Sequence, residues 1–140
     1  MPNSERLLII ILRFLGVSAL FAIPAIFFPY TWMNAIHRFM GLGEMPDSPI
    51  VSYLARSLSA FYATFGGISL LISTNIRLYR QFVLFWGIAF CWLGTLLLGI
   101  DIFSGMPTSW TIGEGPLAIV IGLVILWLQR KIINVDINIE

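Results

Sequence analysis

Four runs of mostly apolar residues alternate with shorter polar segments along the chain. The runs cover about residues 7–28, 50–73, 82–100 and 116–132. A helix crosses the hydrocarbon core of a bilayer with ~20 residues, because each residue adds ~1.5 Å along the helix axis. The pattern therefore predicts an all-α fold: a four-helix transmembrane bundle that forms a single integral membrane domain over residues 1–140.

The segment between the first two runs has a helical pattern of its own. Its apolar residues fall on one helix face, and they are Trp32, Ile36, Phe39 and Met40. Thr31 is a candidate N-cap, and Gly41 or Gly43 is a candidate stop. We expect a short interfacial helix at about residues 32–40, lying in the outer membrane boundary with its aromatic face toward lipid or toward the bundle.

The C-terminal tail, residues 133–140, has a different period. Val135, Ile137 and Ile139 alternate with polar residues, which is the pattern of a half-buried strand. A single strand has no neighbour for its backbone hydrogen bonds. The tail is therefore expected either to be unstructured or to pair with another chain.

Composition supports the membrane assignment and excludes several function classes. Hydrophobic residues make up 59% of the chain and charged residues 11%, whereas soluble domains carry about 25% charged residues. The net charge of +1 and the lack of a basic run argue against a nucleic-acid partner. One cysteine and one histidine permit neither an internal disulfide nor a zinc site. We expect no metal and no cofactor, and the lipid bilayer as the main partner.

The positive charges predict the orientation in the membrane. Five basic residues fall on one side of the predicted spans, and they are Arg6, Arg77, Arg80, Arg130 and Lys131. On the other side Arg38 is the one basic residue, and four acids fall there as well: Glu44, Asp47, Asp101 and Glu114. Because positive residues favour the cytoplasmic face, both termini of this multi-pass membrane protein are predicted to be cytoplasmic.

Arg56 is the most unusual residue of the second run. It lies about six residues from the outer end, ~9 Å deep by helical rise. Intramembrane charges face protein or water and pair with one another. We predict that Arg56 pairs with Asp101, with Glu114 or with both, Pro116 marking the start of the fourth helix. Arg38 is a competing partner for the acids. Tyr53, Ser52 and Ser59 complete the predicted intramembrane polar cluster.

Two readings of this cluster remain open. In one, the ion pair only sets the register of the helices and closes their outer end. In the other, the cluster lines a polar cavity that binds a ligand head group or relays protons.

Small residues on three of the runs predict close helix packing. In the second run Ala55, Ser59, Ala63 and Gly67 recur every four residues, a spacing that allows two helix backbones to approach. The third and fourth runs offer comparable positions, at Gly87, Gly94, Ala118 and Gly122. We predict that these residues form the helix contacts.

Two further residues of the first run are singled out. Arg13 can extend to the inner boundary and bind a lipid head group. Pro24 is expected to kink the helix near its outer end.

Two segments of the chain carry a resemblance to known proteins: ARSLSAFYATFGG, residues 55–67, and EGP, residues 114–116. Through them the chain resembles small bacterial inner-membrane proteins of the DoxX-like type. The resemblance implies a four-helix bundle of a bacterial inner membrane without a well-defined biochemical role, and it supplies no catalytic residues.

Catalytic chemistry is missing from the sequence. No nucleophile, histidine and acid form a credible triad, and no phosphate-binding glycine loop is present. We therefore expect a non-catalytic integral membrane protein, a structural or accessory subunit that binds itself or a larger membrane complex. The alternative is a small binding or transport protein whose outward polar pocket takes a quinone-like or lipid-like ligand.

Overall fold

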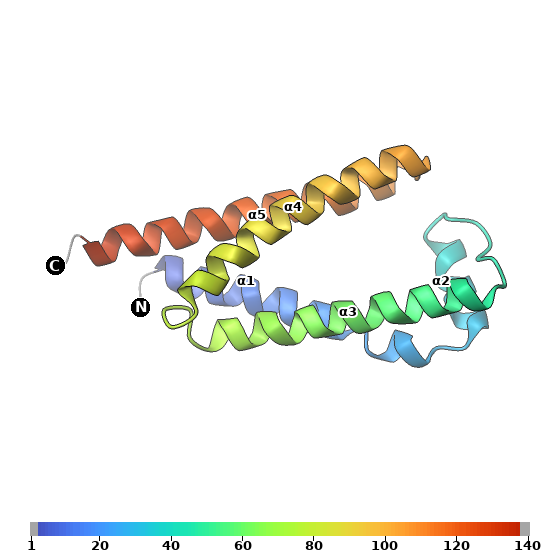
Figure 1. Ribbon diagram of the computed structural model, residues 1–140, viewed down its shortest axis with the longest axis horizontal. Coiled ribbons are helices and arrows are strands. Elements are labelled where there is room, and N and C mark those ends of the chain that lie inside the picture. The colour runs from blue at the N-terminus through green and yellow to red at the C-terminus, as the bar shows by residue number, and fades with distance from the viewer. Residues whose placement is uncertain (1–2, 138–140) are drawn as a thin grey trace. The chain divides into compact units, whose positions relative to one another are not determined.

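Within the part of the chain that the structure describes, four helices are long and apolar enough to cross a membrane. The computed structural model describes residues 3–137, with side chains up to residue 133. The long helices are α1 (Asn3–Leu20), α3 (Pro49–Thr74), α4 (Arg80–Ser104) and α5 (Thr108–Ile137). A 3₁₀ helix, η1 (Pro24–Phe27), and a short helix, α2 (Tyr30–Phe39), lie between α1 and α3 (Figure 1). Within the described residues the fold is all-helical, as predicted.

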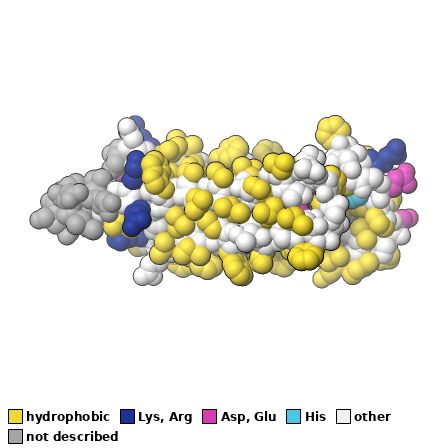
Figure 2. All heavy atoms as spheres, turned by 90° about the horizontal axis from the view of Figure 1, so that it is seen from above, with side chains coloured by type: hydrophobic (Ala, Val, Ile, Leu, Met, Phe, Trp, Pro, Cys, Tyr) yellow, Lys and Arg dark blue, Asp and Glu magenta, His cyan; other side chains and the backbone are white. Residues whose placement is uncertain are grey.

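The surface of these helices is apolar. Hydrophobic side chains are spread over the visible face, interspersed with backbone and other side chains (Figure 2). Phe14 is 70% exposed and Phe103 is 95% exposed. In water such exposure costs about 25 cal/mol for each Å² of apolar surface, whereas in lipid it costs nothing. Helices also satisfy their backbone hydrogen bonds internally, which a membrane span requires.

The described chain divides into two compact units. The first, here called the terminal unit, takes in the residues up to Leu12 and those from Ile72 onward, and so contains α4 and α5. The second, the middle unit, is Arg13–Leu71 and contains η1, α2 and most of α3.

In the terminal unit α4 and α5 form an antiparallel hairpin with a very close contact. A Cβ added to Gly94 would lie 2.5 Å from the carbonyl oxygen of Gly115, and one added to Gly122 would lie 2.6 Å from that of Gly87. The helices turn at Gly105, whose φ of 65° is a left-handed conformation that glycine adopts without strain. Glycine is thus required where the two backbones meet.

In the middle unit α1 and α3 meet at a single pair of glycines. A Cβ on Gly66 would lie 2.7 Å from the carbonyl oxygen of Gly16, and one on Gly16 would lie 2.6 Å from the side chain of Leu70. The four-residue spacing in the sequence predicts a contact at Gly67, the residue after Gly66. A Cβ added to Gly67 has nothing within 4 Å. The contact in this unit therefore uses the neighbouring glycine.

Pro24 does more than kink the first helix. α1 ends at Leu20, and Pro24 begins η1. Pro29 is then the N-cap of α2, in place of the predicted Thr31, and α2 ends ahead of Gly41, whose φ is 77°. Two prolines therefore interrupt the backbone within a few residues, and the chain between α1 and α3 becomes a folded loop.

The start of the last helix differs from the prediction. α5 begins at Thr108, directly after Pro107, so Pro116 lies inside the helix and EGP is not ahead of it. Glu114 is accordingly not at the positive end of the helix. The indole Nε1 of Trp110 donates a hydrogen bond to Glu114 Oε2 across one helical turn, 2.7 Å away, and this contact favours helix on the N-terminal side of the proline.

The prediction of a strand is wrong for residues 133–137, because α5 continues to Ile137. A helix supplies backbone partners from its own segment, which an isolated strand lacks. The remainder of the tail, residues 138–140, lies outside the described part of the chain.

Candidate functional site

Arg56 binds the backbone of Phe28, at the C-terminal end of η1. Its side chain is exposed, and its Nη2 donates a hydrogen bond to the carbonyl oxygen of Phe28 at 3.0 Å. Phe28 follows η1 with extended backbone, and Pro29 comes next. A carbonyl at a helix end has lost its helical partner, and the guanidinium replaces that partner. Within the middle unit, Arg56 therefore ties α3 to the junction between η1 and α2.

The rest of the loop is held by side chains of α2. The Tyr30 hydroxyl donates to the Met45 carbonyl, and the Met45 amide donates to Asn34 Oδ1 at 2.7 Å. His37 Nδ1 lies 2.9 Å from the Gly43 carbonyl oxygen. Partial burial raises the pKa of the Tyr30 phenol, and the nearby carboxylates of Asp47 and Glu44 raise it further. The hydroxyl accordingly stays protonated and remains a donor.

The two acids predicted as partners of Arg56 lie on α4 and α5. Asp101 is only 4% exposed, and its Oδ2 has no hydrogen-bond partner among the described residues. Glu114 accepts from Trp110. Both acids belong to the terminal unit and Arg56 belongs to the middle unit, so the pairing stays a prediction. Arg38, the competing cation, lies 3.7 Å from Glu44 in its own loop.

The other residues of the predicted cluster have ordinary surroundings. Ser59 Oγ donates to the Ala55 carbonyl oxygen within α3, at 2.9 Å. Ser52 is half-buried, Tyr53 is 63% exposed, and Arg13 is exposed on α1.

The predicted packing residues divide between the two units. Gly87, Gly94 and Gly122 lie in the α4–α5 contact of the terminal unit. Ala118 of the same unit is half-buried, as are Ala55 and Ala63 of the middle unit. Three glycines that form close contacts had not been singled out in the sequence: Gly16, Gly66 and Gly115.

The end of the terminal unit where α4 begins carries a polar cluster that the sequence had not predicted. Glu5 is buried, and its Oε1 lies 2.5 Å from Arg77 Nε in an ion pair. Gln129, on the last turns of α5, is 5% exposed and donates from Nε2 to the Arg80 carbonyl oxygen at 2.6 Å. Lys131 lies 3.8 Å above the ring of Trp127. We call this end of the unit, with Arg77, Arg80, Gln129 and Arg130, the basic end.

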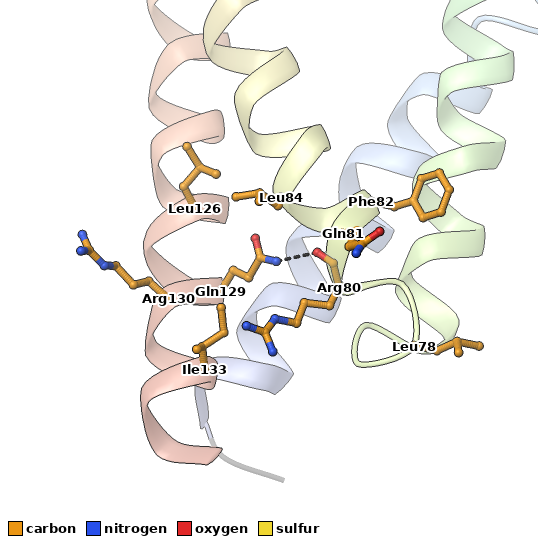
Figure 3. A pocket seen from close by; sticks show the side chains of 9 residues that line it. All are labelled: Leu78, Arg80, Gln81, Phe82, Leu84, Leu126, Gln129, Arg130 and Ile133. Atoms are coloured by element: carbon orange, nitrogen blue, oxygen red, sulfur yellow. Dashed lines mark hydrogen bonds between the residues drawn. The ribbon is translucent and has the colours of Figure 1, made fainter. Parts of the chain in front are cut away.

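A cavity of about 770 Å³ opens at the basic end between α4 and α5. Its apolar wall consists of Leu78, Phe82, Leu84, Leu126 and Ile133, and its polar members are Arg80, Gln81, Gln129 and Arg130 (Figure 3). The Arg80 side chain extends from the start of α4 toward α5, below Gln129 (Figure 3). A second cavity of about 120 Å³ shares Arg80, Gln129 and Ile133 with the first. The basic end thus combines space, apolar surface and positive charge.

The sequence held a signal for this site, but one that was used for a different purpose. The basic residues at these helix ends were used only to predict the orientation of the spans. That use does not predict that Glu5 and Arg77, 72 positions apart, form an ion pair.

Comparisons with protein-family models, with curated proteins and with solved structures find no match for this chain. The DoxX-like resemblance therefore stays a prediction. Among the residues that the structure describes, no three histidine, cysteine or acidic side chains are grouped as a metal ion would require.

Proposed function

We propose that this chain is a non-catalytic, multi-pass membrane protein that binds an anionic, lipid-like amphiphile at its basic end. The observation that carries the proposal is the cavity of about 770 Å³, which joins an apolar wall to two arginines. Pockets for small molecules have volumes of about 300–1,000 Å³ and combine apolar walls with a few polar groups. Basic pockets between transmembrane helices suit anionic lipid head groups.

The start of α4 adds to the attraction for an anion. A helix N-terminus carries a partial positive charge and free amide donors. Arg80 and Gln81 are the first residues of α4, both line the cavity, and Tyr79 provides no side-chain cap. A head-group phosphate at this position would meet the helix end and the Arg80 guanidinium together.

This proposal keeps the lipid-like ligand of the sequence-based alternative and moves its site. The outward pocket expected around Arg56 has less support, since the Arg56 guanidinium binds the Phe28 carbonyl oxygen. The excess of positive residues at the basic end favours a cytoplasmic location for both termini, with α2 toward the outer interface. The assignment to a bacterial inner membrane rests on the DoxX-like resemblance alone.

Retention of lipid by the purified protein tests the proposal. The full chain in mild detergent is exposed to equal amounts of anionic phosphatidylglycerol and zwitterionic phosphatidylcholine, and bound lipid is counted by native mass spectrometry. We expect preferential retention of the anionic lipid, reduced about fivefold by Arg80→Gln, since each arginine near a head group contributes ~1 kcal/mol. Arg38→Gln, a change to an exposed arginine of the outer loop, is the matched control. Equal retention of both lipids by the unchanged protein would contradict the proposal.

A second candidate function is an accessory subunit of a homo-oligomer or larger membrane complex. It is favoured by open glycines on helix surfaces, because an added Cβ at Gly67 or Gly113 meets nothing within 4 Å. Such faces allow another helix to approach closely. The mass of the detergent-solubilised particle tests this function: a clean monomer, unchanged by Gly67→Leu, would argue against it.

A further inference from the structure

The amide of Gln129 has a fixed orientation. Only its nitrogen can donate to the Arg80 carbonyl oxygen, and that contact is 2.6 Å long. The amide oxygen must therefore face the other way. Figure 3 shows it directed toward the side of Leu84 and Leu126, two residues of the cavity wall. A rotation that exchanged the two atoms would place oxygen against oxygen.

The Gln129 oxygen lacks a hydrogen-bond donor. Oε1 is buried and has no hydrogen-bond partner among the described residues. Gln129 as a whole is only 5% exposed. Buried acceptors are nearly always satisfied, and one without a donor is destabilising. Gln129 also lines both cavities of the basic end. A donor brought by a ligand would remove this deficit.

The lining of the cavity thus includes one positively charged region and Gln129, whose buried amide oxygen has no donor among the described residues. Arg80 and the first turn of α4 attract an anion, and the Gln129 oxygen requires a hydroxyl or amine donor. An ammonium donor is disfavoured near the Arg80 guanidinium, which lies below Gln129 (Figure 3), because like charges repel. A neutral hydroxyl group fits both requirements.

We infer that the basic end recognises a phosphodiester whose head group carries a hydroxyl, with the phosphate near Arg80 and the hydroxyl donating to Gln129 Oε1. The inference deepens the proposed function and rests on it. The five apolar wall residues favour a lipid over a water-soluble phosphate, since acyl chains would cover them.

A comparison of two lipids of equal charge tests the hydroxyl. Phosphatidylglycerol and phosphatidylethanol are both phosphodiesters, but only the first has head-group hydroxyls. The full chain is reconstituted in phosphatidylcholine nanodiscs that contain one or the other, and retained lipid is counted by native mass spectrometry. We expect on the order of fivefold preference for phosphatidylglycerol, the size of one hydrogen bond.

Variants separate the hydroxyl from the phosphate. Gln129→Leu should abolish the preference and keep the binding of both anionic lipids, whereas Arg80→Gln should weaken both lipids equally. Thr95→Leu, at an exposed polar residue of α4 that does not line the cavity, is the control and should keep the preference. Because the comparison in the unchanged protein needs no variant, misfolding of Gln129→Leu does not prevent the test.

The outcomes distinguish the inference from the proposed function. Equal retention of the two anionic lipids, both above phosphatidylcholine, would overturn the hydroxyl inference and leave the proposed function standing. No preference for either over phosphatidylcholine would overturn both. Glycerol phosphate, which has no acyl chains, should displace phosphatidylglycerol only at much higher concentration. Equal potency would overturn the assignment to a lipid and indicate a water-soluble phosphate.

Discussion

The two units of this protein hold their helices together by different means. In the terminal unit α4 and α5 meet through glycines spaced along the helices, at Gly87, Gly94, Gly115 and Gly122. In the middle unit α1 and α3 share one glycine contact, and hydrogen bonds from Arg56, Tyr30 and Asn34 stabilise the loop region. Lipid gives apolar helices no reason to associate, so each pair needs close backbone packing or a polar tie.

Breaking the glycine contact should have the largest effect. Gly94→Ala adds a methyl group 2.5 Å from the Gly115 carbonyl oxygen, which is backbone and cannot move aside freely. We expect a loss of about 2–3 kcal/mol in the free energy of unfolding, the cost of overpacking. Unfolding in mixed detergent measures it. Gly99→Ala, on the same helix but with nothing within 4 Å of the new carbon, is the matched control, and an equal loss there would refute the close-contact explanation.

Removing the ion pair of the basic end should rank second. Arg77→Gln leaves the Glu5 carboxylate, with 5% side-chain exposure, without its cation. A fully buried pair broken in this way costs about 3–5 kcal/mol, but the Arg77 side chain is 56% exposed and solvent reduces the value to about 1–2 kcal/mol. The same unfolding assay applies. The double change Glu5→Gln with Arg77→Gln should recover part of the loss, and no recovery would argue against the pair.

Arg56 has two candidate roles that predict different results: the hydrogen bond to the Phe28 carbonyl oxygen and the predicted ion pair with Asp101 or Glu114. Arg56→Gln should cost about 1 kcal/mol through the lost Phe28 contact and speed hydrogen exchange around residues 28–30. Arg13→Gln is the control. A double-mutant cycle with Asp101→Asn measures the predicted ion pair. A coupling energy near zero would remove Asp101 as a partner, and a cycle with Glu114→Gln tests the other acid.

Tyr30 should give the smallest effect, and one that changes at alkaline pH. Its pKa is raised in the folded protein, so folding favours the protonated phenol. This contribution is fully present below the unfolded pKa of about 10 and disappears as the pH rises through the folded value. Tyr30→Phe should therefore lose loop protection at neutral pH and become insensitive to alkali, as measured by hydrogen exchange at Met45. An unchanged alkaline transition in the variant would exclude Tyr30 as its source.

The spans were predictable because hydropathy over ~20 residues is a property of each segment alone. The start of α5 was not, since the preference of proline for a first turn was outweighed by the Trp110–Glu114 contact and the continuous helix around it. The strand pattern of the tail was misleading for a related reason. A segment as short as residues 133–137 fits both a helical and a strand period, and extension of α5 to Ile137 supplies its backbone hydrogen bonds.

The candidate site was less predictable than the fold. Sequence spacing identifies Gly87 and Gly94 as small residues of one helix, but cannot choose between Gly66 and Gly67, which differ only in the face they occupy. The Glu5–Arg77 pair and the orientation of Gln129 depend on which helix ends meet, and that is a tertiary property.

The turn at Gly105 has a consequence for how the protein is made. Only residues 105–107 separate α4 from α5, so this hairpin closes a short loop and its helices can meet as soon as both have been synthesised. The Gly16–Gly66 contact instead closes a loop of about fifty residues, at a higher entropic cost. Although α4 and α5 follow α1 and α3 in the chain, they are expected to associate fastest, as contacts local in sequence generally do.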